Sequence, residues 1–238
     1  DEIQQICEEH LLHSRDSIIA LYLSGIFALQ KGSLDNTQLI NLVDIFQKNH
    51  KEAIVIYLCE SILEDDPNNI FALRVLANQY KKNEKVWDLY KKIIKIDFSE
   101  ADLAKVLAKH YEDEGNEEEA IEYYKKALLR YINNENYSGT TEMWSKLITY
   151  IPDNIDFFQL ARRKMAKSFG EQKTVSPMED LYQYYKDSQQ WDTAIEILKQ
   201  NIEIEPTYQQ LRKNLIECYR GKYANHSQLE SCIKSSNI

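Results

Sequence analysis

The chain has 238 residues, a formal net charge of −9 and 43% hydrophobic residues, with only 6 glycines and 4 prolines. This composition is typical of a helical protein with short turns, and no apolar run approaches the roughly 18 residues that cross a bilayer, so we expect no membrane insertion. The acidic excess lies mainly in residues 1–67, which predicts that this part of the chain repels nucleic acid.

The chain begins at Asp1 without the basic and apolar pattern of a signal peptide, which is typical of a segment cut from a longer protein. Its cysteines are scattered through apolar helical positions and show no disulfide spacing. They indicate buried thiols in a reducing compartment, so we expect a cytoplasmic protein. The four are Cys7, Cys59, Cys218 and Cys232.

Two helices are expected at the start of the chain, over 2–13 and 17–29. The second is apolar almost all round, so it must be covered by neighbouring repeats, by a partner or by another copy of the chain. Self-association is therefore an open alternative. On the first helix Cys7, His10 and His13 lie three residues apart along one side. A zinc site needs a fourth ligand that no nearby Cys or His supplies, so we expect no metal.

Four further helices are predicted by their apolar period, and they are separated by residues that favour caps and turns. These breaks are Asp35-Asn36, Asp66-Pro67-Asn68 and Ser99. The helices are expected over 36–48, 51–65, 69–82 and 84–97.

Residues 101–134 contain the clearest helical hairpin, with Gly115-Asn116 at its turn. Its small residues Ala108 and Ala120 stand where two helices must approach closely, and Tyr111 and Tyr124 lie beside them. This pattern resembles the 34-residue tetratricopeptide repeat. The acidic residues around the turn are either a binding site for a basic partner or, more simply, negative charges that stabilise the start of the second helix.

The pattern continues with a helix that ends at 151, another over 155–169, a polar loop at 170–177, a second clear unit over 175–208, and helices over 208–220 and from 226. We therefore predict an all-α, tetratricopeptide-like right-handed array of about seven helix pairs. It would be a single array over 1–238, with an N-terminal helix pair over 1–34 and repeats over 35–238, of which 101–134 and 175–208 are the best units.

No catalytic or cofactor signature is present. The six glycines are too far apart for a phosphate-binding loop or a dinucleotide fingerprint. Basic residues cluster at 81–95, 162–167 and 212–222, but helical spacing scatters them, so we expect solvated charges and no direct nucleic-acid binding. We predict neither an enzyme nor a cofactor.

Tetratricopeptide arrays bind peptides along the face lined by the first helix of each pair. Arg74 and Asn78 occupy two positions of the carboxylate clamp found in chaperone-binding arrays, but Val106 stands where the clamp needs an asparagine. The geometry of such an array predicts that the inner surface is lined by Arg74, Asn78, Lys105, Lys109, Glu112, Gln183 and Lys186.

The carboxyl-terminal part also resembles the long amino-terminal extension of spirochaete-type Gre transcript-cleavage factors, well over residues 100–238 and only in kind before them. The matching stretches are Ile151-Pro152-Asp153-Asn154-Ile155-Asp156-Phe157-Phe158, Tyr184-Tyr185-Lys186, 191–199, 217–223 and 225–230.

This resemblance implies action with bacterial RNA polymerase, which Gre factors enter with an acidic coiled coil to stimulate cleavage of backtracked RNA. That coiled coil is not in this chain, so no catalytic residue is carried over. The segment would be a protein-interaction scaffold in transcription. The competing hypotheses are a free-standing peptide-binding adaptor or co-chaperone and, third, an RNA-processing repeat protein.

Overall fold

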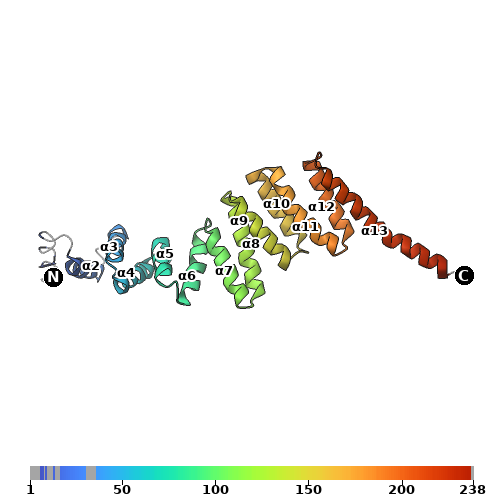
Figure 1. Ribbon diagram of the computed structural model, residues 1–238. Helices are drawn as coiled ribbons and strands as arrows, with labels where there is room; N and C mark the ends of the chain where they lie inside the picture. The colour runs from blue at the N-terminus through green and yellow to red at the C-terminus, as the bar shows by residue number, and fades with distance from the viewer. Residues whose placement is uncertain (1–5, 8, 10–12, 14–16, 31–35, 237–238) are drawn as a thin grey trace. The chain divides into compact units, whose positions relative to one another are not determined.

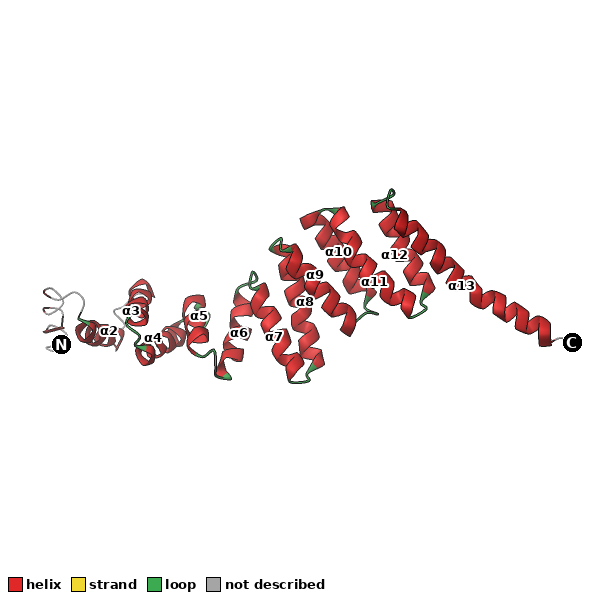
Figure 2. Ribbon diagram, in the orientation of Figure 1, coloured by secondary structure: helices red, strands yellow, loops and turns green. Residues whose placement is uncertain are grey.

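The computed structural model describes residues 6, 7, 9, 13, 17–30 and 36–236, and every regular element in these ranges is a helix (Figure 2). The helix expected over 2–13 lies mostly outside the described residues. The chain divides into two compact units, Asp1–Asp97 and Phe98–Ile238. The predicted single array over 1–238, with its division at residue 35, stays a prediction.

The first unit is built on helices that pack in chain order. Its core lies where α3, α4 and α5 meet, and Val43, Phe46 and Val55 are among its most buried side chains. Tyr22 of α2 packs against this core, whereas Ile19 of α2 is 73% exposed. The helices are α2 (Ile18–Gln30), α3 (Asn36–Lys48), α4 (Glu52–Asp65), α5 (Ile70–Gln79) and α6 (Lys85–Ile96).

The second unit contains successive helix pairs followed by a long α13 (Figure 1). α7 packs on α8 and α11 packs on α12. In the pair α9 and α10, the ring of Trp144 packs against Phe158. Together with the pairs α3/α4 and α5/α6, these pairs confirm the all-α, tetratricopeptide-like fold class. The elements are α7 (Ala101–Asp113), α8 (Glu117–Asn133), α9 (Tyr137–Tyr150), α10 (Ile155–Phe169), the 3₁₀ helix η1 (Glu171–Thr174), α11 (Val175–Asp187), α12 (Trp191–Ile204) and α13 (Gln209–Ser236).

Four inter-helix turns share one hydrogen-bond pattern. In each turn one residue has a positive φ, and the N–H of the next residue donates to the carbonyl five residues before it, at 2.8 to 3.0 Å. This geometry ends a helix and satisfies its last carbonyls. Only one of the four positions is a glycine, so only one turn is evident from the sequence. The positive-φ residues are His50, Gly115, Glu135 and Gln189.

The expected close approach of α7 and α8 is confirmed. Ala104 and Ala108 of α7 and Ala120 and Ala127 of α8 are all fully buried. Because alanine carries only a methyl group, the two backbones can pack closely, and Tyr111 of α7 stacks on Tyr123 of α8 with ring centroids 5.6 Å apart.

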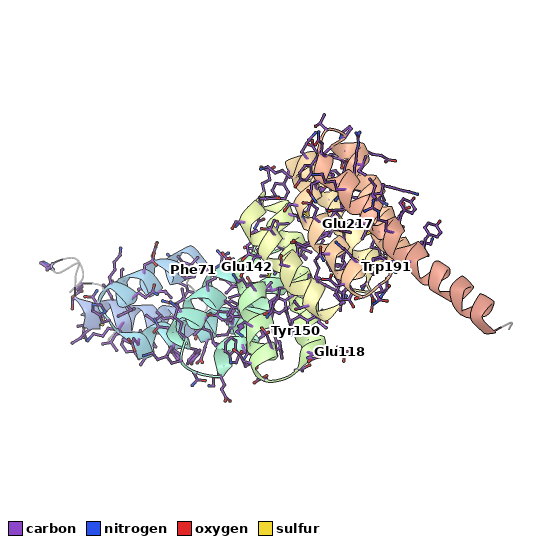
Figure 3. All side chains as sticks on the ribbon, turned by 45° about the vertical axis from the view of Figure 1, so that its right-hand side comes forward. Phe71, Glu118, Glu142, Tyr150, Trp191 and Glu217 are labelled. Atoms are coloured by element: carbon purple, nitrogen blue, oxygen red, sulfur yellow. The ribbon has the colours of Figure 1, made fainter. Side chains whose placement is uncertain are left out.

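The chain after residue 208 differs from the prediction, because α13 is one helix of 28 residues and has no break between 220 and 226. Gly221 lies inside it. A Cβ atom at this position would stand 2.6 Å from the ring of Trp191, at the start of α12 (labelled in Figure 3). The glycine therefore allows close packing of α13 on α12 and does not end the helix.

The segment 170–177 is also more regular than the polar loop that was expected. Gly170 ends α10 with a φ of 90°, residues 171–174 form η1, and α11 starts directly at Val175. Pro177 lies in the first turn of α11, where a backbone N–H would have no partner within the helix.

Candidate functional site

A groove of about 430 Å³ lies over α7 and α9, the first helices of two successive pairs. Most of its lining residues carry a charged or polar group, while their aliphatic stems, with Met143 and Tyr124, make most of the exposed lining apolar. Figure 3 labels Glu142, near the middle of α9, and Tyr150, its last residue. The lining residues are Lys105, Lys109, Glu112, Tyr124, Glu142, Met143, Ser145, Lys146 and Thr149.

Glu112, near the end of α7, is the centre of this groove. One of its carboxylate oxygens accepts from Lys146 Nζ at 2.6 Å and from the Tyr150 hydroxyl at 2.6 Å. The other accepts from the Tyr124 hydroxyl at 2.7 Å and from Lys109 Nζ at 3.4 Å. Its side chain is only 20% exposed, so these four donors replace most of its water. One carboxylate thereby joins α7, α8 and α9.

The hydrogen bonds also change how these groups ionise. Donation by Lys146, and then by the two tyrosines, lowers the pKa of Glu112 to about 2. The same carboxylate raises the pKa of Tyr150 to about 12, because the hydrogen bond favours the protonated phenol. Burial, and then the bond to Glu112, raises the pKa of Tyr124 as well. Glu112 is therefore an anion at neutral pH, and both tyrosines are neutral donors.

Further polar contacts cross between first helices of the second unit. Lys105 of α7 pairs with Glu142 of α9 at 2.6 Å, and Ser145 of α9 donates to Asp180 of α11 at 3.3 Å. The groove wall is held in one arrangement by contacts between helices as well as by the hydrophobic core.

The structure brings together three of the seven residues predicted to line the inner surface. Lys105, Lys109 and Glu112 all line the groove. Gln183 and Lys186 lie on α11, outside this groove: Gln183 donates to Asp187 at 2.7 Å, and Lys186 pairs with Glu217 of α13 at 3.0 Å.

The other two predicted residues belong to the first unit. Arg74 pairs with Asp97 at 2.7 Å. Asn78 lines a separate hollow formed by the ends of α3 and α5 and the start of α4. Contact between these seven residues and a partner stays a prediction.

Sequence reasoning missed Glu142, Lys146 and Tyr150. One signal could have found the Glu112–Lys146 pair: the two residues have opposite charges and are 34 residues apart, the length of one tetratricopeptide unit. Residues one repeat apart occupy similar places on successive first helices, which pack side by side. No comparable signal identifies Tyr150.

The zinc alternative gains no support from the described residues, among which no group of three His, Cys, Asp or Glu side chains is placed to hold a metal ion. Cys7 is buried, and His13 is exposed with Nδ1 3.0 Å from the carbonyl of Glu9. His10 lies outside the described residues. Among the residues that the structure describes, no helix is long and apolar enough to span a membrane.

Two curated proteins resemble this chain along its whole length. A putative GreA-associated domains protein of Treponema pallidum (strain Nichols) is 44% identical, and the match covers 36% of that protein. The transcription elongation factor GreA of Borreliella burgdorferi is 29% identical, with 26% of its length covered. The resemblance to spirochaete Gre-type proteins is thus confirmed, and it includes the residues before 100. The chain spans only about a third or less of these relatives, and it matches no protein-family model.

Solved structures with similar helical folds are more distant. YrrB, described as a TPR protein with an unusual peptide-binding site, is 17% identical, with a TM-score of 0.37 over 79% of this chain and 95% of its own. MamA is 16% identical, with a TM-score of 0.37 over 73% of this chain and 93% of its own.

Proposed function

We propose that this chain is the helical-repeat scaffold of a Gre-type transcription factor in the cytoplasm and that its protein partner is bacterial RNA polymerase, to which it docks the factor. The names of the two relatives support the link to transcription elongation. The role is one of binding, since the cleavage activity of a Gre factor would belong to a module outside this segment.

The observation that carries the proposal is the groove over α7 and α9 with its charged groups ordered by contacts between helices. Its charged side chains are already held by contacts between helices, so a partner that binds there does not have to order them. The paired charges favour a peptide that carries both acidic and basic residues. Its acidic side chains can pair with Lys105 and Lys109, and its basic side chains can pair with Glu142.

The docking role can be tested with purified core RNA polymerase. Full-length protein that contains this segment should be retained on immobilised polymerase more strongly than the same protein without it. Equal retention would contradict the docking role and would favour a free-standing adaptor, whose partner would then be sought elsewhere.

Filling the groove should weaken partner binding by at least about fivefold. Ser145 and Thr149 line the groove and are exposed, so the double variant S145R/T149R places two long side chains in the space without entering the core. The measurement is the dissociation constant for polymerase, with folding checked by circular dichroism. The control is S188R/T207R, which adds the same charge at exposed turn residues outside the groove. Unchanged binding by the groove variant would place the partner on another surface.

A further inference from the structure

One side of α10 carries a stripe of three basic residues and one apolar residue. Leu160, Arg163, Lys164 and Lys167 have the spacing i, i+3, i+4, i+7, which places them along one face of the helix. All four are exposed, Leu160 by 41%, whereas Phe158, Ala161 and Met165 face the core. The stripe belongs to the second helix of its pair, so it is separate from the groove over α7 and α9.

A hollow of about 430 Å³ lies along this stripe. Leu160, Arg163, Lys164, Ala166 and Lys167 of α10 line it, and Glu171 of η1 closes one end. The shape depends on Gly170, whose φ of 90° turns the chain sharply at the end of α10 so that η1 stands beside it. The hollow thus has an apolar patch, a row of cations and a defined end.

The cations of the hollow are not neutralised by the protein. Glu171 lines the hollow, but its carboxylate pairs with Arg162 at 3.7 Å, and Arg162 also donates to Gln200 at 3.2 Å. Within the described residues Arg163, Lys164 and Lys167 form no ion pair or side-chain hydrogen bond. Cations near the end of a helix interact favourably with its dipole, which accounts for Lys167 in the last turn. It accounts neither for three cations on one face nor for the exposed leucine among them.

We propose that this hollow binds an acidic segment of a partner protein, with two or three Asp or Glu side chains opposite the cations and one apolar side chain against Leu160. Charge complementarity supports an anionic ligand. A protein segment fits better than nucleic acid, because no aromatic side chain on which a base could stack lines the hollow.

The test uses the full chain and a fluorescein-labelled peptide of Asp, Glu and Ser with one central Leu. Binding is followed by fluorescence anisotropy at low and at raised salt. The K164E/K167E variant should bind about tenfold more weakly than the wild type, because two attractions become repulsions. The L160S variant should bind a few-fold more weakly, and salt should weaken wild-type binding. The matched control, K199E/K213E, makes the same charge change at exposed lysines of α12 and α13 and should bind like the wild type.

Three results would overturn the proposal. The first is equal loss of binding in K164E/K167E and K199E/K213E, which would mean that only net charge matters. The second is no measurable binding of the peptide at low salt. The third is tighter binding of a uridine oligonucleotide than of the peptide, with loss in K164E/K167E, which would assign the hollow to RNA. Since all the substituted residues are exposed, the variants should keep the thermal unfolding midpoint of the wild type.

Discussion

Replacement of Trp144 by alanine should lower the free energy of unfolding by about 3–5 kcal/mol, the range for a large aromatic side chain removed from a core. Trp144 is fully buried in α9. Its ring packs edge-on against Phe158 of α10, with ring centroids 4.9 Å apart, and its Nε1 donates to the carbonyl of Pro177 in α11 at 2.7 Å. The substitution leaves a cavity where three helices meet and removes the hydrogen bond between α9 and the start of α11.

Urea unfolding followed by circular dichroism measures this loss, and Trp144→Phe divides it into two parts. Phenylalanine keeps most of the ring contacts but lacks the N–H, so it should cost about 1–2 kcal/mol, the value of one buried hydrogen bond and a small change in volume. A loss below about 1 kcal/mol for Trp144→Ala would contradict the packing described for these helices.

Most of the helix boundaries in the second unit could be predicted because local signals repeat there. The period of small and aromatic residues in 101–134 marks α7 and α8, and Gly115-Asn116 marks their turn. The unit over 175–208 likewise contains α11 and α12. These signals act between residues a few positions apart, so they can be recognised without knowledge of the tertiary structure.

Features that depend on distant residues could not be predicted in this way. Gly221 looks like a helix break in the sequence, but its role is set by Trp191, thirty residues earlier. The turns at Glu135 and Gln189 use a positive φ that those residue types rarely adopt, so residue type does not mark these helix ends.

The groove, too, could be predicted from the sequence only in part. Periodicity placed Lys105, Lys109 and Glu112 on the inner face of α7, and the structure brings them together in the groove. It could not show that Glu112 accepts from Tyr124, Lys146 and Tyr150, because these contacts depend on how α8 and α9 pack against α7.

The second large effect is expected for Glu112→Gln, which should lower the free energy of unfolding by about 2 kcal/mol near neutral pH, a reduced value for charged hydrogen bonds at a partly exposed group. A neutral amide accepts hydrogen bonds from Lys146 and the tyrosines less strongly than a carboxylate does. Glu203→Gln is the control, because it removes one negative charge from an exposed position on α12 and should change stability little.

The difference between wild type and Glu112→Gln should depend on pH. Since the pKa of Glu112 is lowered from 4.5 to about 2 in the folded protein, its contribution is complete above about pH 4.5 and declines as the pH falls toward 2. Urea unfolding near pH 7, 4.5 and 3.5 should therefore show a gap between the two proteins that narrows only at the lowest value. A difference in the free energy of unfolding that stays constant over this range would mean that Glu112 stabilises the fold by packing and not as an anion. The description of the groove as organised around an ionised carboxylate would then be wrong.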